Sequence, residues 1–361
     1  MADETILNNA PQYDDAAEQA RFLEKRKQQM AEDFAKPFDP ECVLEVRHLR
    51  KTFPIKKTMM GKVTKELVAV DDISFKLKAG ETLGIVGESG CGKTTAGRAI
   101  LKLHQPTGGQ IIFDGQDITN FNSKQMRPIR RQMQIIFQDP YSSLPPRSTV
   151  GGILSEPVEV HKIVPKAQVK EYVLGLMDKC GLRDYYYERY PHEFSGGQRQ
   201  RICIARALSV APKLVICDEP VSALDVSIQA QIINLLKELQ RDMNLAYVFI
   251  SHDLSVVKFI SDKIGVMYLG SMMEFGTKED IFRNPLHPYT KALFSAVPNP
   301  DPTAKMERIK LEGDIPSPAN PPMGCRFHTR CPYAKEICKH IPPEYREYEE
   351  GHFAACHLLE E

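Results

Sequence analysis

The chain has 361 residues, a length that allows two domains or one large domain with appendages. Apolar residues make up 42% and charged residues 26%, as in a soluble globular protein. The 47 Lys and Arg residues balance 47 Asp and Glu residues, which excludes a broad basic surface for nucleic acid and leaves room only for a local patch.

No run of about 18 apolar residues is present, and the acidic N-terminus lacks the layout of a signal peptide. We therefore expect the chain to stay in the cytosol. Its nine cysteines are then expected to be reduced thiols or metal ligands, not disulfides.

Residues 1–41 are polar, and Asp14–Phe34 has the composition of a helix with alternating charge signs. We expect a solvated leader helix. The alternative is a docking helix that uses four apolar side chains, Phe22, Leu23, Met30 and Phe34.

The pattern then changes to short β-like runs separated by turn residues. The basic stretch Arg47–Glu66 is predicted to be a loop. Phe53 lies within it, and its residue type favours packing over stacking on an adenine ring. The predicted strands around this stretch are Val43–Val46, Val68–Val70 and Ile73–Leu77.

Gly87–Thr95 has the spacing G-x-x-x-x-G-K-T of a phosphate-binding loop, between a predicted strand at Thr82–Val86 and a predicted helix at Ala96–Leu103. Its glycines let successive amide groups converge on phosphate oxygens, and the helix N-terminus favours an anion. Lys93 is predicted to reach the β- and γ-phosphates, and the Thr94 hydroxyl to ligate Mg²⁺. The other loop residues predicted to bind nucleotide are Gly87, Glu88, Ser89, Gly90, Cys91, Gly92 and Thr95.

Two more strands are predicted at Ile111–Phe113 and Gln134–Phe137, after which Gln138 opens a region of helical segments broken by prolines. An inserted helical subdomain over about residues 139–195 fits this region. It ends at Ser195-Gly-Gly-Gln198, ahead of a predicted helix at Ile202–Ser209.

Asp218 and Glu219 follow a continuous apolar run, which is typical of a strand covered on both faces. Acids at the carboxyl end of such a strand lie where open α/β sheets bind ligands. Asp218 is predicted to hold Mg²⁺, and Glu219 to orient and deprotonate the attacking water.

A long helix is predicted at Ile228–Met243 and a strand at Ala246–Ile250, followed by His252. Alone, His252 would be a structural histidine. At the end of a strand beside a phosphate site, a γ-phosphate contact is favoured. Two strands, Ile264–Leu269 and Met272–Phe275, complete the predicted core.

Together and in this order, these motifs resemble the ATP-binding subunit of ABC transporters over roughly Val43 to Gly276. The resemblance implies an α/β phosphate-loop NTPase cassette at 42–282, with an antiparallel β subdomain and the helical insert. The leader 1–41 precedes it, and a proline-rich, cysteine-containing extension at 283–361 follows it.

In that family two cassettes close head to tail around two ATP molecules. The resemblance therefore implies ATP and Mg²⁺ as cofactors, with Lys93, Glu219 and His252 catalytic. Mg²⁺ would be held by Thr94, Gln138 and Asp218.

Other roles concern the adenine, the partner cassette and the membrane subunits. Phe53 falls where the family stacks an aromatic on adenine, which reverses the interpretation from residue type. Asp225 would organise the interface, and Gln138 would link Mg²⁺ to the surface that faces the membrane subunits. The residues that would cap the partner's γ-phosphate are Ser195, Gly196, Gly197 and Gln198.

The tail narrows the resemblance to the ATPases of oligopeptide/dipeptide importers, and to the second of their two types. This implies an ATPase coupled to transmembrane transport, peripheral on the cytoplasmic face of the membrane. Its partners would be a sister ATPase, two membrane permease subunits and, indirectly, an extracytoplasmic solute-binding protein. The motifs that carry this resemblance are Asn284–Thr290, Ser317–Pro322, Gly324–Pro332 and Gly351–Leu358.

Two alternatives stay open. The chain could serve an importer of nickel, glutathione or another small solute, since the same subfamily includes such relatives. It could instead be a soluble ABC ATPase that acts on nucleic acid or ribosomes, although no second cassette, coiled coil or basic surface is visible.

Four cysteines of the tail are spaced C-x5-C-x6-C-x17-C in a short, proline-rich segment that could hardly fold by apolar burial alone, which indicates a stabilising metal site. The spacing lacks the C-x2-C pairs typical of zinc sites. The family resemblance favours a [4Fe–4S] cluster, with zinc or free thiols as alternatives. The four residues are Cys325, Cys331, Cys338 and Cys356.

Overall fold

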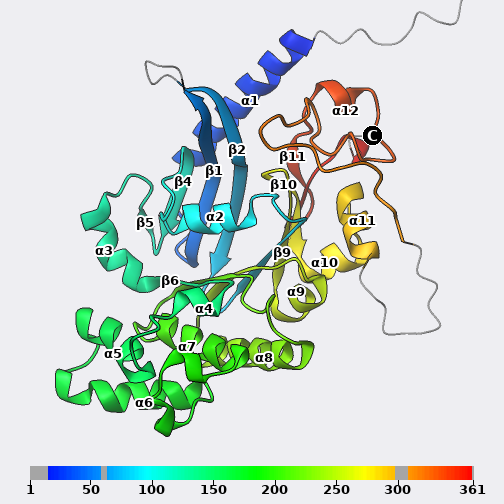
Figure 1. Cartoon of the computed structure of the whole chain (residues 1–361). Coiled ribbons are helices and arrows are strands. Elements are labelled where there is room, and N and C mark those ends of the chain that lie inside the picture. The colour runs from blue at the N-terminus through cyan, green and yellow to red at the C-terminus, as the bar shows by residue number, and fades with distance from the viewer. Residues whose placement is uncertain (1–14, 58–62, 297–307, 360–361) are drawn as a thin grey trace, which may run out of the picture.

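The computed structural model describes residues 15–57, 63–296 and 308–359, in helical and sheet layers (Figure 1). Residues 1–14 of the predicted leader lie outside this part of the chain. The strands are β1 Cys42–Lys57, β2 Val63–Lys78, β3 Thr82–Val86, β4 Gly108–Phe113, β5 Gln116–Asp117, β6 Met133–Ile136, β7 Leu214–Asp218, β8 Ala246–Ile250, β9 Lys263–Tyr268, β10 Ser271–Thr277, β11 Tyr345–Glu349 and β12 His352–Ala355.

The α-helices include short ones of a single turn. They are α1 Asp15–Ala35, α2 Lys93–Ile100, α3 Ser123–Gln132, α4 Pro140–Ser143, α5 Val150–Val160, α6 Val169–Lys179, α7 Gly196–Leu208, α8 Val226–Met243, α9 Leu254–Ile260, α10 Lys278–Arg283, α11 Pro288–Ser295 and α12 Ile337–His340.

The larger sheet has the strand order β11-β12-β10-β9-β3-β8-β7-β6. The run from β9 to β6 is parallel, and β10, β12 and β11 add antiparallel strands at one edge. Every residue of β3, β7 and β8 is buried, as expected for strands covered on both faces. Because parallel strands end at the same edge, the segments after β3, β6, β7 and β8 meet there.

The smaller sheet is antiparallel, with the order β2-β1-β4-β5. It shows that the loop predicted for Arg47–Glu66 is wrong: β1 continues to Lys57, β2 starts at Val63, and Phe53 is paired with Leu67. The far half of this two-stranded ribbon is largely exposed on both faces. Its charged side chains therefore need no apolar alternation, which is why the composition resembled a loop.

Helices α4 to α7 lie between β6 and β7 in the chain, below the sheets in Figure 1. Their apolar faces share one core with residues from α8 and from the larger sheet. Helix α7 begins earlier than predicted because Ser195 caps it, with its hydroxyl accepting from the Gln198 N–H.

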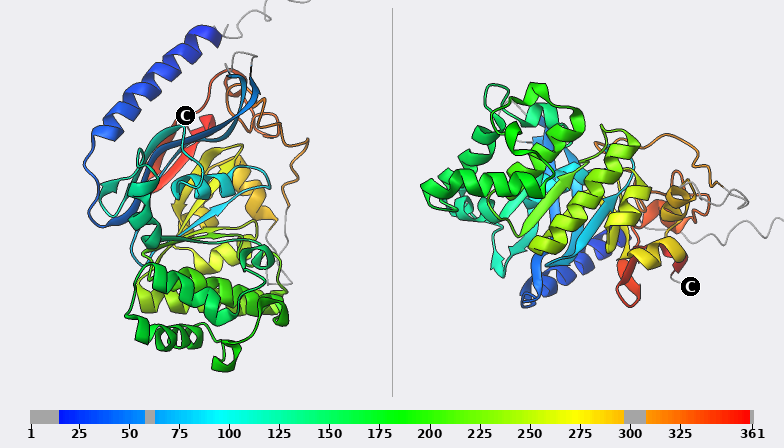
Figure 2. Two further views of the ribbon diagram at one scale, coloured as in Figure 1. Left: turned by 60° about the vertical axis from the view of Figure 1, so that its left-hand side comes forward. Right: turned by 90° about the horizontal axis from the view of Figure 1, so that it is seen from below.

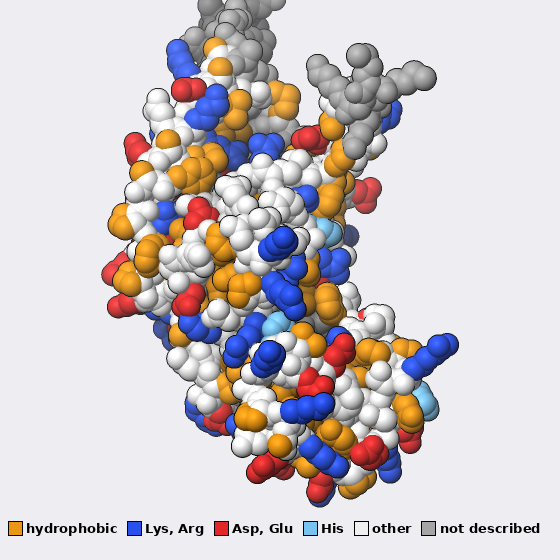
Figure 3. Space-filling view, turned by 90° about the vertical axis from the view of Figure 1, so that its left-hand side faces the viewer, with side chains coloured by type: hydrophobic (Ala, Val, Ile, Leu, Met, Phe, Trp, Pro, Cys, Tyr) orange, Lys and Arg blue, Asp and Glu red, His pale blue; other side chains and the backbone are white. Residues whose placement is uncertain are grey.

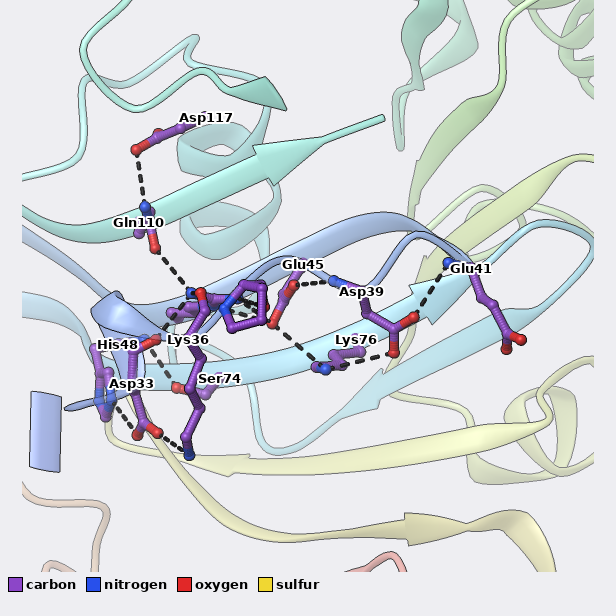
Figure 4. A network of polar contacts seen from close by, with 12 residues as sticks. Asp33, Lys36, Asp39, Glu41, Glu45, His48, Ser74, Lys76, Gln110 and Asp117 are labelled. Carbon is purple, nitrogen blue, oxygen red and sulfur yellow. Dashed lines mark hydrogen bonds and ion pairs between the residues drawn. The ribbon is translucent and has the colours of Figure 1, made fainter. Parts of the chain in front are cut away.

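Helix α1 crosses the outside of the antiparallel sheet (Figure 2). Polar contacts attach its C-terminal end to β1, including Arg47 donating to the backbone oxygens of Asp33 and Lys36, and His48 Nε2 lying 2.9 Å from Asp33 Oδ2 (Figure 4). Leu23 is 52% exposed and Phe34 37%. The predicted helix is thus present but not solvated all round, because ion pairs and backbone contacts hold it to its own chain.

On the face seen in Figure 3, Lys and Arg side chains are interspersed with Asp and Glu. No described helix combines the length and the hydropathy required to cross a bilayer.

Candidate functional site

The turn between β3 and α2 is a loop that requires glycine at two points. Gly87 and Gly92 have φ angles of 149° and 106°. A Cβ on Gly87 would lie 2.1 Å from the backbone oxygen of Met267, and one on Gly92 would lie 2.1 Å from that of Ala69. The loop backbone is therefore packed directly against neighbouring backbone, while Ser89 and Gly90 are exposed at its tip.

Lys93 begins α2 and is only 5% exposed. Its Nζ donates to the backbone oxygens of Gly87, at 2.7 Å, and Glu88, at 3.0 Å. The ammonium thus lies against the backbone at the start of the phosphate loop. A buried cation among converging amides and a helix N-terminus favours a polyphosphate anion.

Thr94 and Asp218 bring the loop and the end of β7 together, with the Thr94 hydroxyl donating to Asp218 Oδ1 at 2.6 Å. Burial raises the pKa of Asp218 above its ordinary value, opposed by the hydrogen bond from Thr94 and by the Arg98 guanidinium. A hydroxyl and a buried carboxylate side by side fit Mg²⁺, which protein sites bind through one or two carboxylates together with substrate phosphates.

Glu219 stands beside this pair and receives two side chains on one carboxylate oxygen. Gln138 Nε2 donates to Glu219 Oε2 at 3.0 Å, and His252 Nδ1 lies 3.2 Å from the same atom. Glu219 has a φ of 49°, unusual for a residue with a side chain, and its N–H donates to the Ile250 oxygen. Strained backbone of this kind costs about 1–3 kcal/mol and persists only where the surrounding structure holds it.

These contacts gather Lys93, Thr94, Gln138, Asp218 and Glu219, together with His252, at the carboxyl ends of four adjacent strands. Each follows or ends a parallel strand, so the fold itself places them together. The arrangement can hold a nucleotide triphosphate with its metal ion and present a carboxylate to an attacking water.

Three predicted elements are not joined to this group by any contact among the described residues. Ser195 caps α7 in a capping box with Gln198, whose Nε2 donates to the Tyr186 hydroxyl at 3.3 Å. Asp225 is exposed at the start of α8. Phe53 is half-buried on β1, with its ring edge-on to His104 and Lys51 Nζ 4.7 Å from the ring centroid.

The tail contributes contacts to the loop that were not predicted. The Tyr289 hydroxyl accepts from the Glu88 N–H at 3.0 Å, and Arg330 donates to both oxygens of the Glu88 carboxylate. Both residues lie in motifs that identified the subfamily, but nothing in those motifs indicated which segment they touch.

Three of the four tail cysteines have neighbouring thiols close enough to help raise their pKa. Burial, and then the neighbouring thiols, raise the pKa of Cys325 to about 12 and that of Cys356 to about 11, and the pKa of Cys331 is raised for the same reasons. The described residues nevertheless contain no group of three or more His, Cys, Asp or Glu side chains placed to hold a metal ion. The thiols converge without forming a single-ion site.

Comparison with known families gives two matches along the chain. A family model described as "ABC transporter" matches residues 70–222. A second, described as "Oligopeptide/dipeptide transporter, C-terminal region", matches residues 273–338.

Two curated relatives are similar over most of the chain. The oligopeptide transport ATP-binding protein AppF of Bacillus subtilis is 56% identical over 321 residues, 88% of this chain and 98% of that protein. OppF of Haemophilus influenzae, with the same description, is 53% identical over 323 residues, 88% of this chain and 97% of that protein.

Two solved structures share the fold. The cbiO1 protein from Clostridium perfringens, part of the ABC transporter complex cbiONQ, has a TM-score of 0.59 and 27% identity, covering 68% of this chain and 92% of that one. The dimeric bacterial ABC transporter cassette MJ0796 has a TM-score of 0.57 and 24% identity, covering 65% and 98%.

Proposed function

We propose a catalytic cycle for this chain, which belongs to the oligopeptide-importer branch of the ABC transporter ATP-binding family and hydrolyses ATP to power peptide import. The observation that carries the cycle is the contact of Glu219 with both Gln138 and His252, beside the Thr94–Asp218 pair. Nickel and glutathione are less well supported as cargo, because the curated relatives are named for oligopeptides. Nucleic acid is less well supported as a partner, because Lys and Arg balance Asp and Glu in number.

In this cycle the loop Gly87–Thr95 binds the phosphates of ATP, and Lys93 exchanges its two carbonyl partners for β- and γ-phosphate oxygens. Thr94, Gln138 and Asp218 hold Mg²⁺, which when bound neutralises charge that develops on the phosphates. Phe53 stacks on the adenine. The adenine must use the face of the Phe53 ring that the Lys51 ammonium does not cover.

Glu219 accepts a proton from the water that attacks the γ-phosphorus. A bond forms between the water oxygen and that phosphorus, and the bond to the β–γ bridging oxygen breaks, leaving ADP and phosphate. Gln138 and His252 orient the carboxylate, and His252 donates to the γ-phosphate. Electrostatic positioning of this kind supplies most of the rate enhancement in phosphoryl transfer.

The site is completed by a second cassette. Ser195 is exposed at the cap of α7, Gly196, Gly197 and Gln198 follow it in the first turn, and among the described residues none of the four has a hydrogen bond or ion pair to its own phosphate loop. We assign these four residues to the γ-phosphate of the partner, with Asp225 at the interface. The solved cassette MJ0796 is described as a dimer. The partner here is a sister ATPase of the same importer.

Opening and closing of this dimer transmits the ATP cycle to two membrane permease subunits, to which an extracytoplasmic solute-binding protein delivers peptide. The chain is accordingly placed on the cytoplasmic face of the membrane as a peripheral subunit, with Gln138 linking the Mg²⁺ site to the surface that faces the permeases.

We retain a [4Fe–4S] cluster as the ligand of Cys325, Cys331, Cys338 and Cys356, with zinc and free thiols as alternatives. Support comes from the proximity of these thiols, which lie in two segments of the tail, Cys325, Cys331 and Cys338 before β11 and Cys356 after β12. A cubane cluster is larger than one ion and keeps its cysteine sulfurs farther apart, so it does not require single-ion geometry. Iron, sulfide and zinc analysis of anaerobically purified chain tests this, and stoichiometric zinc or no metal would overturn it.

The closure step is tested with Glu219→Gln, which should trap ATP. Mixed with the sister ATPase, MgATP and no permease, this variant is expected to form a stable dimer in light scattering. Ser195→Arg added to this chain should prevent dimerisation while the chain alone still binds ATP. A dimer that forms equally well with Ser195→Arg would contradict the assignment of Ser195.

A further inference from the structure

The phosphate loop is held from outside the cassette motifs by two residues of the C-terminal extension. Arg330 donates to both carboxylate oxygens of Glu88, at 2.6 and 3.0 Å, and the Tyr289 hydroxyl accepts from the Glu88 N–H at 3.0 Å. Glu88 is the second residue of the loop, so its side chain and its backbone are both fixed by the tail.

The Arg330 side chain is buried and is held by a second hydrogen bond. Its side chain is only 7% exposed, and it also donates to the Tyr268 hydroxyl at 3.4 Å. The rings of Tyr268, Tyr289 and Phe327 are fully buried and contact one another, with centroid separations between 4.8 and 5.4 Å. Both groups that reach Glu88 are therefore anchored to a packed aromatic cluster and not to a flexible surface.

A second chain of contacts joins the extension to the other side of the loop. Arg326 donates to the Leu269 backbone oxygen and to the Asp71 carboxylate. The next residue after Leu269, Gly270, donates its N–H to the Cys91 oxygen at 2.8 Å and accepts from the Asp71 N–H at 2.8 Å. Cys91 belongs to the phosphate loop. The extension therefore supports this loop at two separate points, Glu88 and Cys91.

The charge on Glu88 gives the Arg330 contact a consequence for ligand binding. A carboxylate within a phosphate loop repels the anion that the loop binds, unless an opposite charge accompanies it. A bidentate guanidinium supplies that charge and also directs the carboxylate away from the loop centre.

We propose that Arg330 and Tyr289 are positioning residues of the nucleotide site, so that the C-terminal extension preorganises the phosphate loop and neutralises Glu88. The inference rests on the ATP site proposed above. Loss of preorganisation weakens apparent affinity in proportion to the fraction of protein whose loop is competent. Arg326 follows Cys325 in the chain, and Arg330 precedes Cys331. The segment that carries these cysteines therefore also carries the two arginines that contact the phosphate loop and its support.

The test is equilibrium binding of a fluorescent ATP analogue to the full-length chain, with thermal denaturation without nucleotide measured in parallel. Arg330→Met is expected to weaken binding roughly tenfold, about 1.4 kcal/mol. Arg330→Lys, which keeps the charge but not the fork, should lie between this variant and the wild type. The matched control is Arg308→Met, an exposed arginine of the same extension, which should bind like the wild type.

The decisive variant combines Arg330→Met with Glu88→Gln. If Arg330 acts by neutralising and holding Glu88, removal of the Glu88 charge should restore affinity to within about threefold of the wild type. A purely structural role of Arg330 predicts no such recovery and a lowered unfolding temperature in both variants.

Tyr289→Phe keeps the buried ring and removes only the hydroxyl, so it tests the second contact even if Arg330→Met does not fold. A weakening of about threefold is expected. Wild-type affinity of Arg330→Met for the ATP analogue would overturn the proposal. Wild-type affinity of both single variants, Tyr289→Phe and Arg330→Lys, would overturn it as well. A wild-type chain that does not bind the analogue would instead overturn the nucleotide site on which the proposal depends.

Discussion

His252 Nδ1 lies 3.2 Å from Glu219 Oε2 although the two residues follow different strands, β8 and β7. The contact exists because these strands are parallel neighbours whose carboxyl ends meet at one edge. With the Gln138 amide on the same oxygen, the Glu219 carboxylate is oriented from two sides before any ligand arrives. This is the arrangement expected of a general base that is oriented before the nucleotide, Mg²⁺ and the second cassette complete the site.

Glu219→Gln should reduce ATP turnover by roughly 10²–10⁴-fold, because the amide cannot accept the proton of the attacking water. ATP affinity should be retained, since Glu219 is not placed to bind the phosphates. Phosphate release and nucleotide binding measure the two effects. Glu238→Gln, an exposed acid on α8, serves as the control. Turnover near that of the wild type would move the base to another residue.

Lys93→Ala should weaken ATP binding by roughly ten- to a hundredfold, because a charge-assisted contact to the phosphates is lost. Lys102→Ala is a matched control: that lysine is also buried and donates to three backbone oxygens, of Ile118, Thr119 and Phe121, away from the loop. It should lower the free energy of unfolding without changing nucleotide affinity. Equal ATP binding by Lys93→Ala and the wild type would contradict the phosphate-loop assignment.

Removal of Mg²⁺ with a chelator should abolish hydrolysis, and Asp218→Asn should raise the Mg²⁺ concentration needed for half-maximal activity by about tenfold or more. The asparagine can still accept the Thr94 hydroxyl bond, so the fold around Asp218 is preserved while its charge is lost. A Mg²⁺ titration of ATPase activity makes the measurement. An unchanged midpoint would mean that the ion is held elsewhere.

His287 gives the fold a dependence on acid pH. It is buried, caps α11 by accepting the Tyr289 N–H on Nδ1, and burial lowers its pKa from 6.5 to about 4, opposed by Glu274. The unfolded chain therefore binds a proton below about pH 6.5 that the folded chain takes up only near pH 4. As the pH falls from 6.5 to about 4, the free energy of unfolding should therefore decrease by at most roughly 3 kcal/mol.

His287→Asn keeps a capping oxygen without a titrating ring and should flatten this slope in denaturant titrations between pH 6.5 and 4. The pKa values of His48 and His352 are raised, so their stabilising contributions are lost as the pH rises and do not enter the same interval. An identical slope in wild type and His287→Asn would exclude His287 as its source.

The core of the fold could be predicted because β3 and β8 are continuous apolar runs, and both strands have the predicted bounds. The outer half of the ribbon of β1 and β2 could not, since its residues are largely charged and exposed, although its inner half contains the strands predicted at Val43–Val46, Val68–Val70 and Ile73–Leu77. The strand Tyr345–Glu349 is likewise charged, largely exposed and stabilised by its place at the edge of the sheet. The Arg330–Glu88 contact joins residues 242 positions apart, and no local pattern encodes such a pairing.

We propose above that this ATPase drives peptide import from the membrane surface. The most direct test of this proposal is affinity purification of the tagged full-length chain from membranes solubilised in mild detergent, followed by identification of every copurifying protein. The account predicts two multi-span permease subunits and a sister ATPase, in a complex whose ATP turnover rises when the solute-binding protein and peptide are added. Recovery of ribosomes or nucleic acid with no membrane protein would contradict it.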